Sequence, residues 1–132
     1  MKKILLCVIF LLPVLYSCHK DEFKIDPNNL LIGVWNQSDY QGNVIVYARQ
    51  KEFSNNPCYK FNNDGTLVER KNSGWCGTPP VSYADYDGTW TMLNDTLLQI
   101  TSGYWGGTTT YKLDINLVTE ASLKVTYVYD SK

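Results

Sequence analysis

The chain has 132 residues with 12 basic and 13 acidic side chains, and its formal net charge at pH 7 is −1. Phosphate binding needs clustered lysine and arginine, and no such basic patch is present, so a nucleic-acid partner is not expected. This length suits one domain with one hydrophobic core.

The N-terminus begins with a short charged region followed by an apolar one. Lys2 and Lys3 precede an apolar run from Ile4 to Leu15. This run is too short for a comfortable membrane span, and the pattern is typical of a secretory signal peptide. We therefore expect residues 1–17 to be a signal peptide, with cleavage at a nearby ordinary site as the alternative.

The sequence Leu15-Tyr16-Ser17-Cys18 resembles the lipobox of bacterial lipoproteins, although Tyr16 is bulkier than usual. The resemblance implies that Cys18 carries a lipid, which anchors the mature protein to a membrane. Because Lys2 and Lys3 are the only charged residues before Cys18, cleavage there would leave 10 basic and 13 acidic side chains and a net charge of about −3.

Residues 18–30 have the composition of a tether, with charged and turn-forming side chains. The sequence Lys20-Asp21-Glu22 after Cys18 resembles the lipoprotein export signal of Bacteroidota. That resemblance implies lipid anchoring in the cell outer membrane, at its outer face. A plain solvated linker is the alternative, and the sequence leaves the leaflet open.

From Leu31 onward the chain is rich in Tyr, Trp, Val, Ile and Thr, which fit a pleated, half-buried surface. Turn signals such as Asp64-Gly65 and Gly106-Gly107 recur at short intervals, and no segment has a convincing helical pattern. The pattern predicts eight strands, at approximately 31–40, 43–50, 57–62, 66–72, 86–92, 96–102, 108–116 and 121–129.

Apolar side chains occupy every second position near the C-terminal end. The expected inward faces are Tyr111, Leu113, Ile115 and Leu117 in one strand and Leu123, Val125, Tyr127 and Tyr129 in the next. Such a sheet has exposed edges unless it closes, and eight strands are enough to close a barrel. We therefore predict an all-β, antiparallel up-and-down eight-stranded β-barrel over residues 31–132, with Trp35 and Trp90 in its core.

Three motifs in this order resemble lipocalins. Leu31-Ile32-Gly33-Val34-Trp35 resembles their Gly-x-Trp opening, and the Asp-Gly hairpin over residues 59–66 resembles that of the lipocalin-like lipoproteins of Bacteroidota. Gly88-Thr89-Trp90 followed by residues 95–100 continues the pattern. The resemblance covers residues 31–129 and implies a lipocalin-like barrel that binds a small apolar or glycan ligand. The chain is shorter than most lipocalins and lacks the helix that they carry after the last strand.

Two cysteines, Cys58 and Cys76, remain in the mature chain beside Cys18. In an exported protein oxidation is possible, and we expect these two to form a disulfide. The closed loop of about 18 residues would contribute roughly 3 kcal/mol. A zinc site is not expected, because the only histidine is His19, beside the lipid.

Aromatic side chains mark two connections. If all eight strands connect as neighbours, the connections at 51–56, 73–85 and 103–107 share one barrel end with the tether, and the short turns, including 41–42, share the other. Trp75, Tyr104 and Trp105 would then lie at one rim. They form a candidate recognition surface, because such rings stack on sugars or apolar ligands. The alternative is that both tryptophans fold inward and plug the barrel.

Glu69 and Arg70 are adjacent in a predicted strand, so one of them must point inward. An inward Arg70 could hold an anionic ligand, whereas an inward Glu69 would need a partner. Because the predicted barrel contains no histidine and shows no marked pair of carboxylates, phosphate loop or metal-ligand spacing, we expect no enzyme activity, cofactor or metal. The predicted function is ligand binding; the alternative is a non-catalytic accessory or structural subunit of a cell-envelope protein complex.

Overall fold

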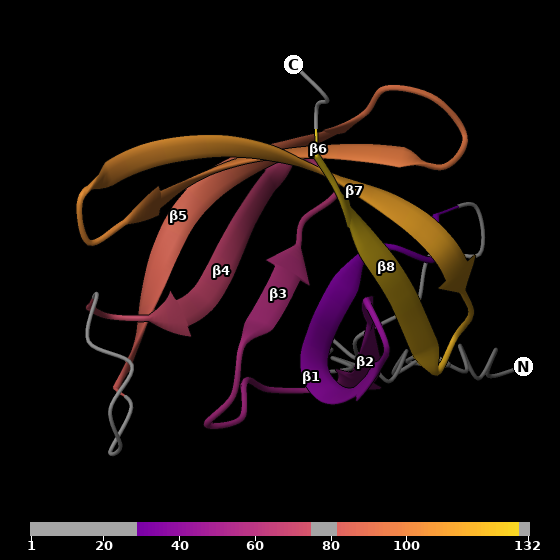
Figure 1. Cartoon of the computed structure of the whole chain (residues 1–132), viewed down its shortest axis with the longest axis horizontal. Helices are drawn as coiled ribbons and strands as arrows, with labels where there is room; N and C mark the ends of the chain where they lie inside the picture. Colours follow the sequence, from indigo (N-terminus) through magenta and orange to yellow (C-terminus); the bar gives the residue numbers. More distant parts are fainter. Residues whose placement is uncertain (1–28, 75–81, 130–132) are drawn as a thin grey trace, which may run out of the picture.

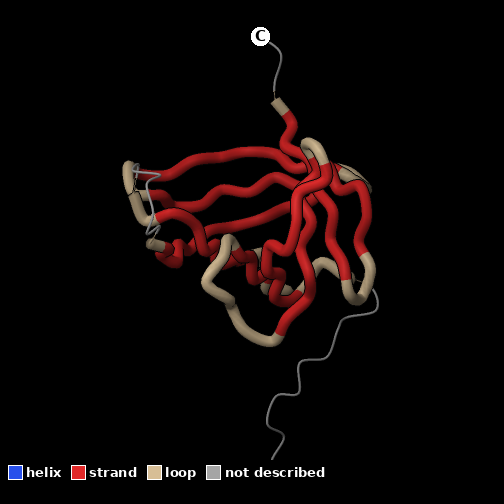
Figure 2. Tube along the Cα trace, turned by 60° about the horizontal axis from the view of Figure 1, so that its bottom comes forward, coloured by secondary structure: helices blue, strands red, loops and turns tan. Residues whose placement is uncertain are grey.

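The computed structural model describes residues 29–74 and 82–129. In these residues eight strands form one closed barrel (Figure 1), and Figure 2 shows strands joined by loops. The strands are β1 (Gly33–Gln41), β2 (Val44–Gln50), β3 (Cys58–Phe61), β4 (Thr66–Asn72), β5 (Tyr83–Met92), β6 (Leu97–Tyr104), β7 (Gly107–Val118) and β8 (Ser122–Val128). The predicted all-β barrel of eight antiparallel strands is confirmed. The described ranges contain no helix with the length and apolar character needed to cross a membrane.

Strand pairing follows the chain order from β3 to β8, and every pairing is antiparallel. β1 lies between β2 and β3, because Trp35 pairs with Arg49 on one side and with Tyr59 on the other. β2 closes the ring against β8, where Ile45 pairs with Val125. The connection over residues 51–57 must therefore pass across β1.

This pairing changes which turns share a barrel end. Because β1 is antiparallel to β3, the β1–β2 turn lies at the same end as the β4–β5 and β6–β7 connections. The chain before β1 enters at the opposite end, beside the β7–β8 turn, where the Arg49 side chain bonds to Ile32 and Glu120. The expectation that the tether enters beside the long connections was wrong. Residue spacing alone does not reveal that β1 inserts between β2 and β3.

The inward side chains form one apolar core. Its buried members are Leu31, Trp35, Ile45, Tyr47, Tyr59, Phe61, Leu67, Leu98, Ile100, Leu113, Leu123 and Val125. Trp90 packs against this cluster, and its Nε1 donates to the Asn62 carbonyl oxygen at 3.0 Å. The core position predicted for Trp35 is therefore confirmed, and Trp90 packs against the core while staying partly buried.

Two expected inward faces end earlier than the sequence pattern suggests. A register shift between Ile115 and Leu117 directs Val118 against the core and leaves Leu117 41% exposed. A bulge of this kind reverses the alternation of the residues that follow it. Tyr127 and Tyr129 are 38% and 86% exposed, because they lie where β8 ends. Leu117 and Tyr129 are therefore not core residues, contrary to the prediction, whereas Tyr127 keeps the predicted inward face but is only partly buried, with its ring centroid 5.7 Å from that of Tyr111.

The chain preceding β1 seals one end of the barrel. Leu31 is buried in the core, and the Trp35 Nε1 donates to its carbonyl oxygen at 2.9 Å. The Arg49 guanidinium lies over the Trp35 indole, 4.1 Å from the ring centroid. It donates to the carbonyl oxygens of Ile32 at 2.7 Å and Glu120 at 2.6 Å. The first bond satisfies the partly buried carbonyl group of Ile32, and the second ties the exposed β7–β8 turn to Arg49.

At the opposite end, β4 to β7 extend beyond the closed part of the barrel. β8 pairs with β7 from Lys112 onward, so in the described chain residues 107–111 pair with β6 alone. Gly88 allows close strand approach here, because a Cβ at this position would lie 2.3 Å from the Thr101 carbonyl oxygen. The β6–β7 turn consequently projects at the left of Figure 1, while the first described residues lie at the right.

Candidate functional site

The predicted aromatic residues of the β6–β7 turn form an exposed tip. Trp105 is 56% exposed, and its ring lies edge-on to Tyr104 with centroids 5.8 Å apart. A Cβ at Gly106 would lie 2.6 Å from the Tyr104 ring. Because glycine has no Cβ, the Tyr104 ring can pack across the turn. Trp105 does not plug the barrel, and this alternative was wrong for it. Trp75 lies outside the described residues, so its predicted role stays a prediction.

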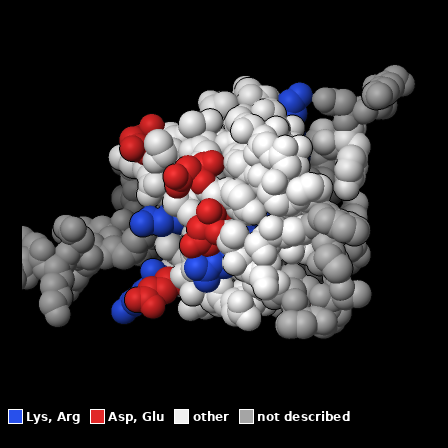
Figure 3. Space-filling model, turned by 90° about the vertical axis from the view of Figure 1, so that its left-hand side faces the viewer, with Lys and Arg blue, Asp and Glu red and all other residues white. Residues whose placement is uncertain are grey.

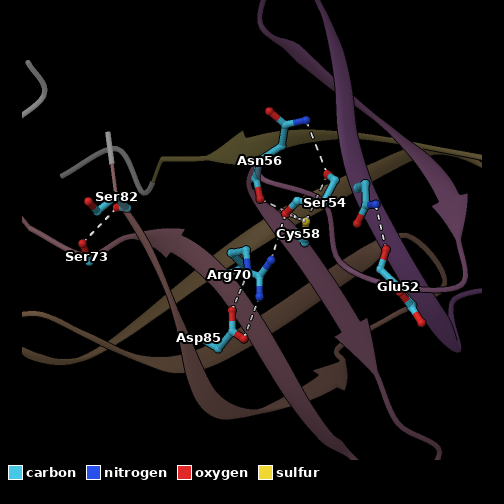
Figure 4. Close-up of polar contacts among 9 residues, drawn as sticks. Glu52, Ser54, Asn56, Cys58, Arg70, Ser73, Ser82 and Asp85 are labelled. Atoms are coloured by element: carbon cyan, nitrogen blue, oxygen red, sulfur yellow. Dashed lines mark hydrogen bonds and ion pairs between the residues drawn. The ribbon is translucent and has the colours of Figure 1, made fainter. Parts of the chain in front are cut away.

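Arg70 does not point into the barrel. Its guanidinium forms two bonds with the Asp85 carboxylate, at 2.7 and 3.0 Å, and donates to the Ser54 carbonyl oxygen at 3.0 Å (Figure 4). It also lies 5.0 Å from the centroid of the Phe53 ring. The hydrogen bond from Arg70 lowers the pKa of Asp85, and the same bond raises the pKa of Arg70. Arg70 therefore holds the β2–β3 connection against β4 and β5, and an anion site inside the barrel on Arg70 is not supported.

Cys58 lies close to this ion pair, under the β2–β3 connection. Its side chain is buried, and among the described residues its thiol forms no disulfide and donates to the Asn56 carbonyl oxygen at 3.0 Å (Figure 4). Its expected disulfide partner, Cys76, lies outside the described residues, as does Cys18. The Cys58–Cys76 bridge and the lipid on Cys18 remain predictions.

The inward residue of the adjacent pair is Glu69, which is 6% exposed. Its Oε2 accepts hydrogen bonds from the Lys71 Nζ at 3.0 Å and from the Ser102 Oγ at 2.5 Å. Its Oε1 accepts one from the Tyr111 hydroxyl at 2.8 Å. The Tyr111 oxygen in turn lies 2.6 Å from the Tyr59 hydroxyl. We call these five residues the Glu69 cluster.

The donors of the Glu69 cluster have a defined order. Because the Tyr111 proton is used toward Glu69, the Tyr59 hydroxyl must donate to the Tyr111 oxygen. Burial raises the pKa of Tyr59, and burial together with the Glu69 charge raises the pKa of Tyr111. Burial and the same carboxylate raise the pKa of Tyr127 to about 12. All three hydroxyls stay protonated at neutral pH; Tyr111 donates its proton to the Glu69 carboxylate, and Tyr59 donates to Tyr111.

Sequence reasoning missed this cluster, although one signal was present. Glu69 and Lys71 are two residues apart in a strand and hence share a face, and their charges are opposite. Ser102 interrupts the apolar face of Leu98 and Ile100 in the same way. Only the pairing of the strands brings Glu69, Lys71 and Ser102 to the same level of the barrel. Donors of the cluster bond both carboxylate oxygens of Glu69, so the buried charge is satisfied. The cluster therefore has a structural role inside the barrel.

Charged side chains of both signs are mixed on the face seen in Figure 3, and much of that face carries neither. In residues 29–74 and 82–129, no three His, Cys, Asp or Glu side chains come together in a way that could hold a metal ion. No family model matches the chain, and no curated protein or solved structure shows significant similarity to it.

Proposed function

We propose that this chain is a lipid-anchored binding module of the bacterial outer membrane, similar to the lipocalin-like lipoproteins of Bacteroidota. Cys18 carries the anchor, residues 1–17 are the signal peptide, and the barrel binds a small apolar or glycan ligand without catalysis. The ligand contacts the Tyr104–Trp105 tip. The resemblance of the lipobox and of the three strand motifs supports this family assignment.

The observation that carries the binding site is the exposure of Trp105. A tryptophan that is 56% exposed and held edge-on against Tyr104 offers a large, rigid contact surface at low entropic cost. Such a ring stacks on a sugar ring or on an apolar ligand. The β6–β7 turn has only two residues, and Tyr104 and Gly107 on either side of it form the last pair of the strand ladder. This short turn holds the Tyr104 and Trp105 rings in place.

The position of the tip also supports a recognition role. The described chain begins at the sealed end of the barrel, and the tip lies at the other end (Figure 1). A tether that joins at the sealed end therefore leaves the tip at the far side of the domain from its attachment.

Binding inside the barrel has less support than binding at the tip. The interior between the sealed end and the Glu69 cluster is occupied by side chains that include Trp35, Leu98 and Val125, each with 0% exposure. This filled interior favours a second candidate, the accessory or structural subunit of an envelope complex. A partner protein that co-purifies with the chain in fixed proportion, with no ligand bound at the tip, would favour that candidate.

The test compares Trp105→Ala with Leu93→Ala, an exposed apolar residue in the turn between β5 and β6 at the sealed end. Binding of soluble neutral oligosaccharides and of small apolar probes is measured by titration calorimetry. We expect Trp105→Ala to weaken binding roughly tenfold, about 1.4 kcal/mol, because it removes the stacking surface. Leu93→Ala should bind normally. Equal affinity of wild type and Trp105→Ala would refute the proposed site.

A further inference from the structure

Two large apolar side chains are exposed at the sealed end of the barrel. Leu93, in the β5–β6 turn, is 47% exposed, and Leu117, near the end of β7, is 41% exposed. Single exposed leucines are common on soluble proteins, so neither residue alone indicates a site. What distinguishes this pair is the surface that lies between them.

A hollow of about 450 Å³ lies between the β5–β6 turn, the end of β7 and the chain that precedes β1. Its apolar lining consists of Leu30, Leu31, Met92, Ile115 and Val118. Leu93 directly follows Met92 in the chain, and Leu117 directly precedes Val118. Both exposed leucines therefore border the same hollow, and we call the leucines and the hollow together the sealed-end patch.

The start of the described chain indicates what covers this patch. Asn29, at which the described chain begins, itself lines the hollow. In the proposed function the lipid anchor is on Cys18, eleven positions earlier in the sequence. A fully extended chain of that length spans at most about 40 Å, so the anchor keeps the sealed-end patch close to the bilayer. A contact too weak for binding from solution becomes effective when a tether makes it intramolecular.

We propose that the sealed-end patch contacts the surface of the lipid bilayer to which the chain is anchored. The inference rests on the proposed lipid anchor at Cys18 and adds a second contact with the same membrane. Leu93 and Leu117 enter the boundary between the lipid headgroups and the acyl chains, where apolar side chains leave water. Lipid then covers the hollow, and the Tyr104–Trp105 tip faces away from the membrane.

The charges of this end select the kind of lipid. Each of its three short turns, at 62–65, 93–96 and 119–121, contains one carboxylate and no lysine or arginine; the carboxylates are those of Asp64, Asp95 and Glu120. The guanidinium of the nearby Arg49 is bonded to backbone carbonyl oxygens. An anionic lipid surface attracts cationic segments and repels carboxylates. The patch therefore fits a zwitterionic surface and not a strongly anionic one.

The test uses the full-length lipidated protein, labelled with nitrogen-15, in phosphatidylcholine nanodiscs that contain a nitroxide-labelled lipid. The amide signals of Asn94 and Thr119 report on the patch, and those of Gly106 and Gly107 report on the tip. We expect the nitroxide to remove intensity from the patch signals and to leave the tip signals unchanged. Patch signals that keep their full intensity would overturn the inference.

The lipid composition tests the charge argument in the same nanodiscs. Replacing part of the phosphatidylcholine by phosphatidylglycerol should restore intensity at the patch, because the added negative charge repels the carboxylates of the three turns. A larger loss of intensity with phosphatidylglycerol would overturn the assignment of a zwitterionic surface.

A double variant identifies the side chains responsible. Leu93→Asn together with Leu117→Asn removes the apolar contact at two positions that are already partly exposed, and should reduce the loss of patch intensity roughly twofold. Val128→Asn is the matched control, because Val128 is 37% exposed where β8 ends, and it should behave as wild type. An equal loss of patch intensity in the double variant and in wild type would overturn the inference.

Mass spectrometry of the same sample separates this inference from the proposed anchor. If Cys18 carries no lipid and the chain does not associate with the nanodiscs, the anchor and the inference are both wrong. If Cys18 carries a lipid but the nitroxide leaves the patch signals unchanged, only the inference is wrong. The hollow is then covered by the chain that precedes Asn29 or by a partner protein.

Discussion

The two ends of this barrel are built differently. At the end where the chain enters, Leu31, Trp35 and Arg49 form an apolar seal in which one guanidinium satisfies several carbonyl groups. At the other end, the interior carries the Glu69 cluster, and β4 to β7 continue beyond the closed ring. The comparison teaches that the sealed end supplies stability by apolar burial, while the polar end depends on a network whose members need one another.

The largest effect is expected at the sealed end. Trp35 has 0% exposure, so Trp35→Ala removes a fully buried indole and leaves a cavity under Arg49. We expect the free energy of unfolding to fall by about 3–5 kcal/mol. Urea denaturation followed by circular dichroism measures this loss. A loss below about 1 kcal/mol would show that the sealed end is not the main source of stability.

An intermediate effect is expected from the Glu69 cluster. Glu69→Leu leaves the Lys71 ammonium without its carboxylate, and the two side chains are 9% and 21% exposed. Because the Lys71 side chain stays partly exposed to solvent, we expect the free energy of unfolding to fall by about 2 kcal/mol, which is less than for a fully buried pair. The double variant Glu69→Leu with Lys71→Leu should recover most of it, because no uncompensated charge remains.

Urea denaturation of the two single variants and the double variant forms the cycle that measures this coupling. Additive losses, with no recovery in the double variant, would mean that Glu69 and Lys71 act independently. The polar end would then not be a network.

The smallest effect is expected outside the barrel, at the ion pair between Arg70 and Asp85. These side chains are 27% and 44% exposed, so Arg70→Ala should lower the free energy of unfolding by about 0.2–1 kcal/mol. Lys60→Ala, an exposed neighbour on β3, is the control and should have little effect.

The pH dependence of this small effect has a definite sign. Arg70 lowers the folded-state pKa of Asp85 below its usual value of 3.8. The carboxylate therefore stabilises the fold fully above this value, and its contribution is lost as the pH falls below it. The free energies of unfolding of wild type and Arg70→Ala should differ at pH 7 and become equal below about pH 4. A difference that grows on acidification would contradict the assigned ion pair.

Much of the fold could be predicted because strand alternation is a local property. The spacing of Leu98 and Ile100, or of Leu123 and Val125, identifies their inward faces without any knowledge of neighbouring strands. The same local reasoning failed at Leu117, where a bulge shifts the register, and Tyr129, where the strand ends. Bulges and strand ends depend on the partner strand, which is why residue spacing did not predict them.

The candidate sites divide in the same way. Sequence alone identified Tyr104 and Trp105, because aromatic residues before two glycines indicate an exposed turn, and it showed that either Glu69 or Arg70 must point inward. Only the tertiary structure decided that Glu69 does so, because its donors Ser102 and Tyr111 come from strands far along the chain. The insertion of β1 between β2 and β3 was likewise decided there, since strand pairing depends on long-range closure of the barrel, which local alternation does not encode.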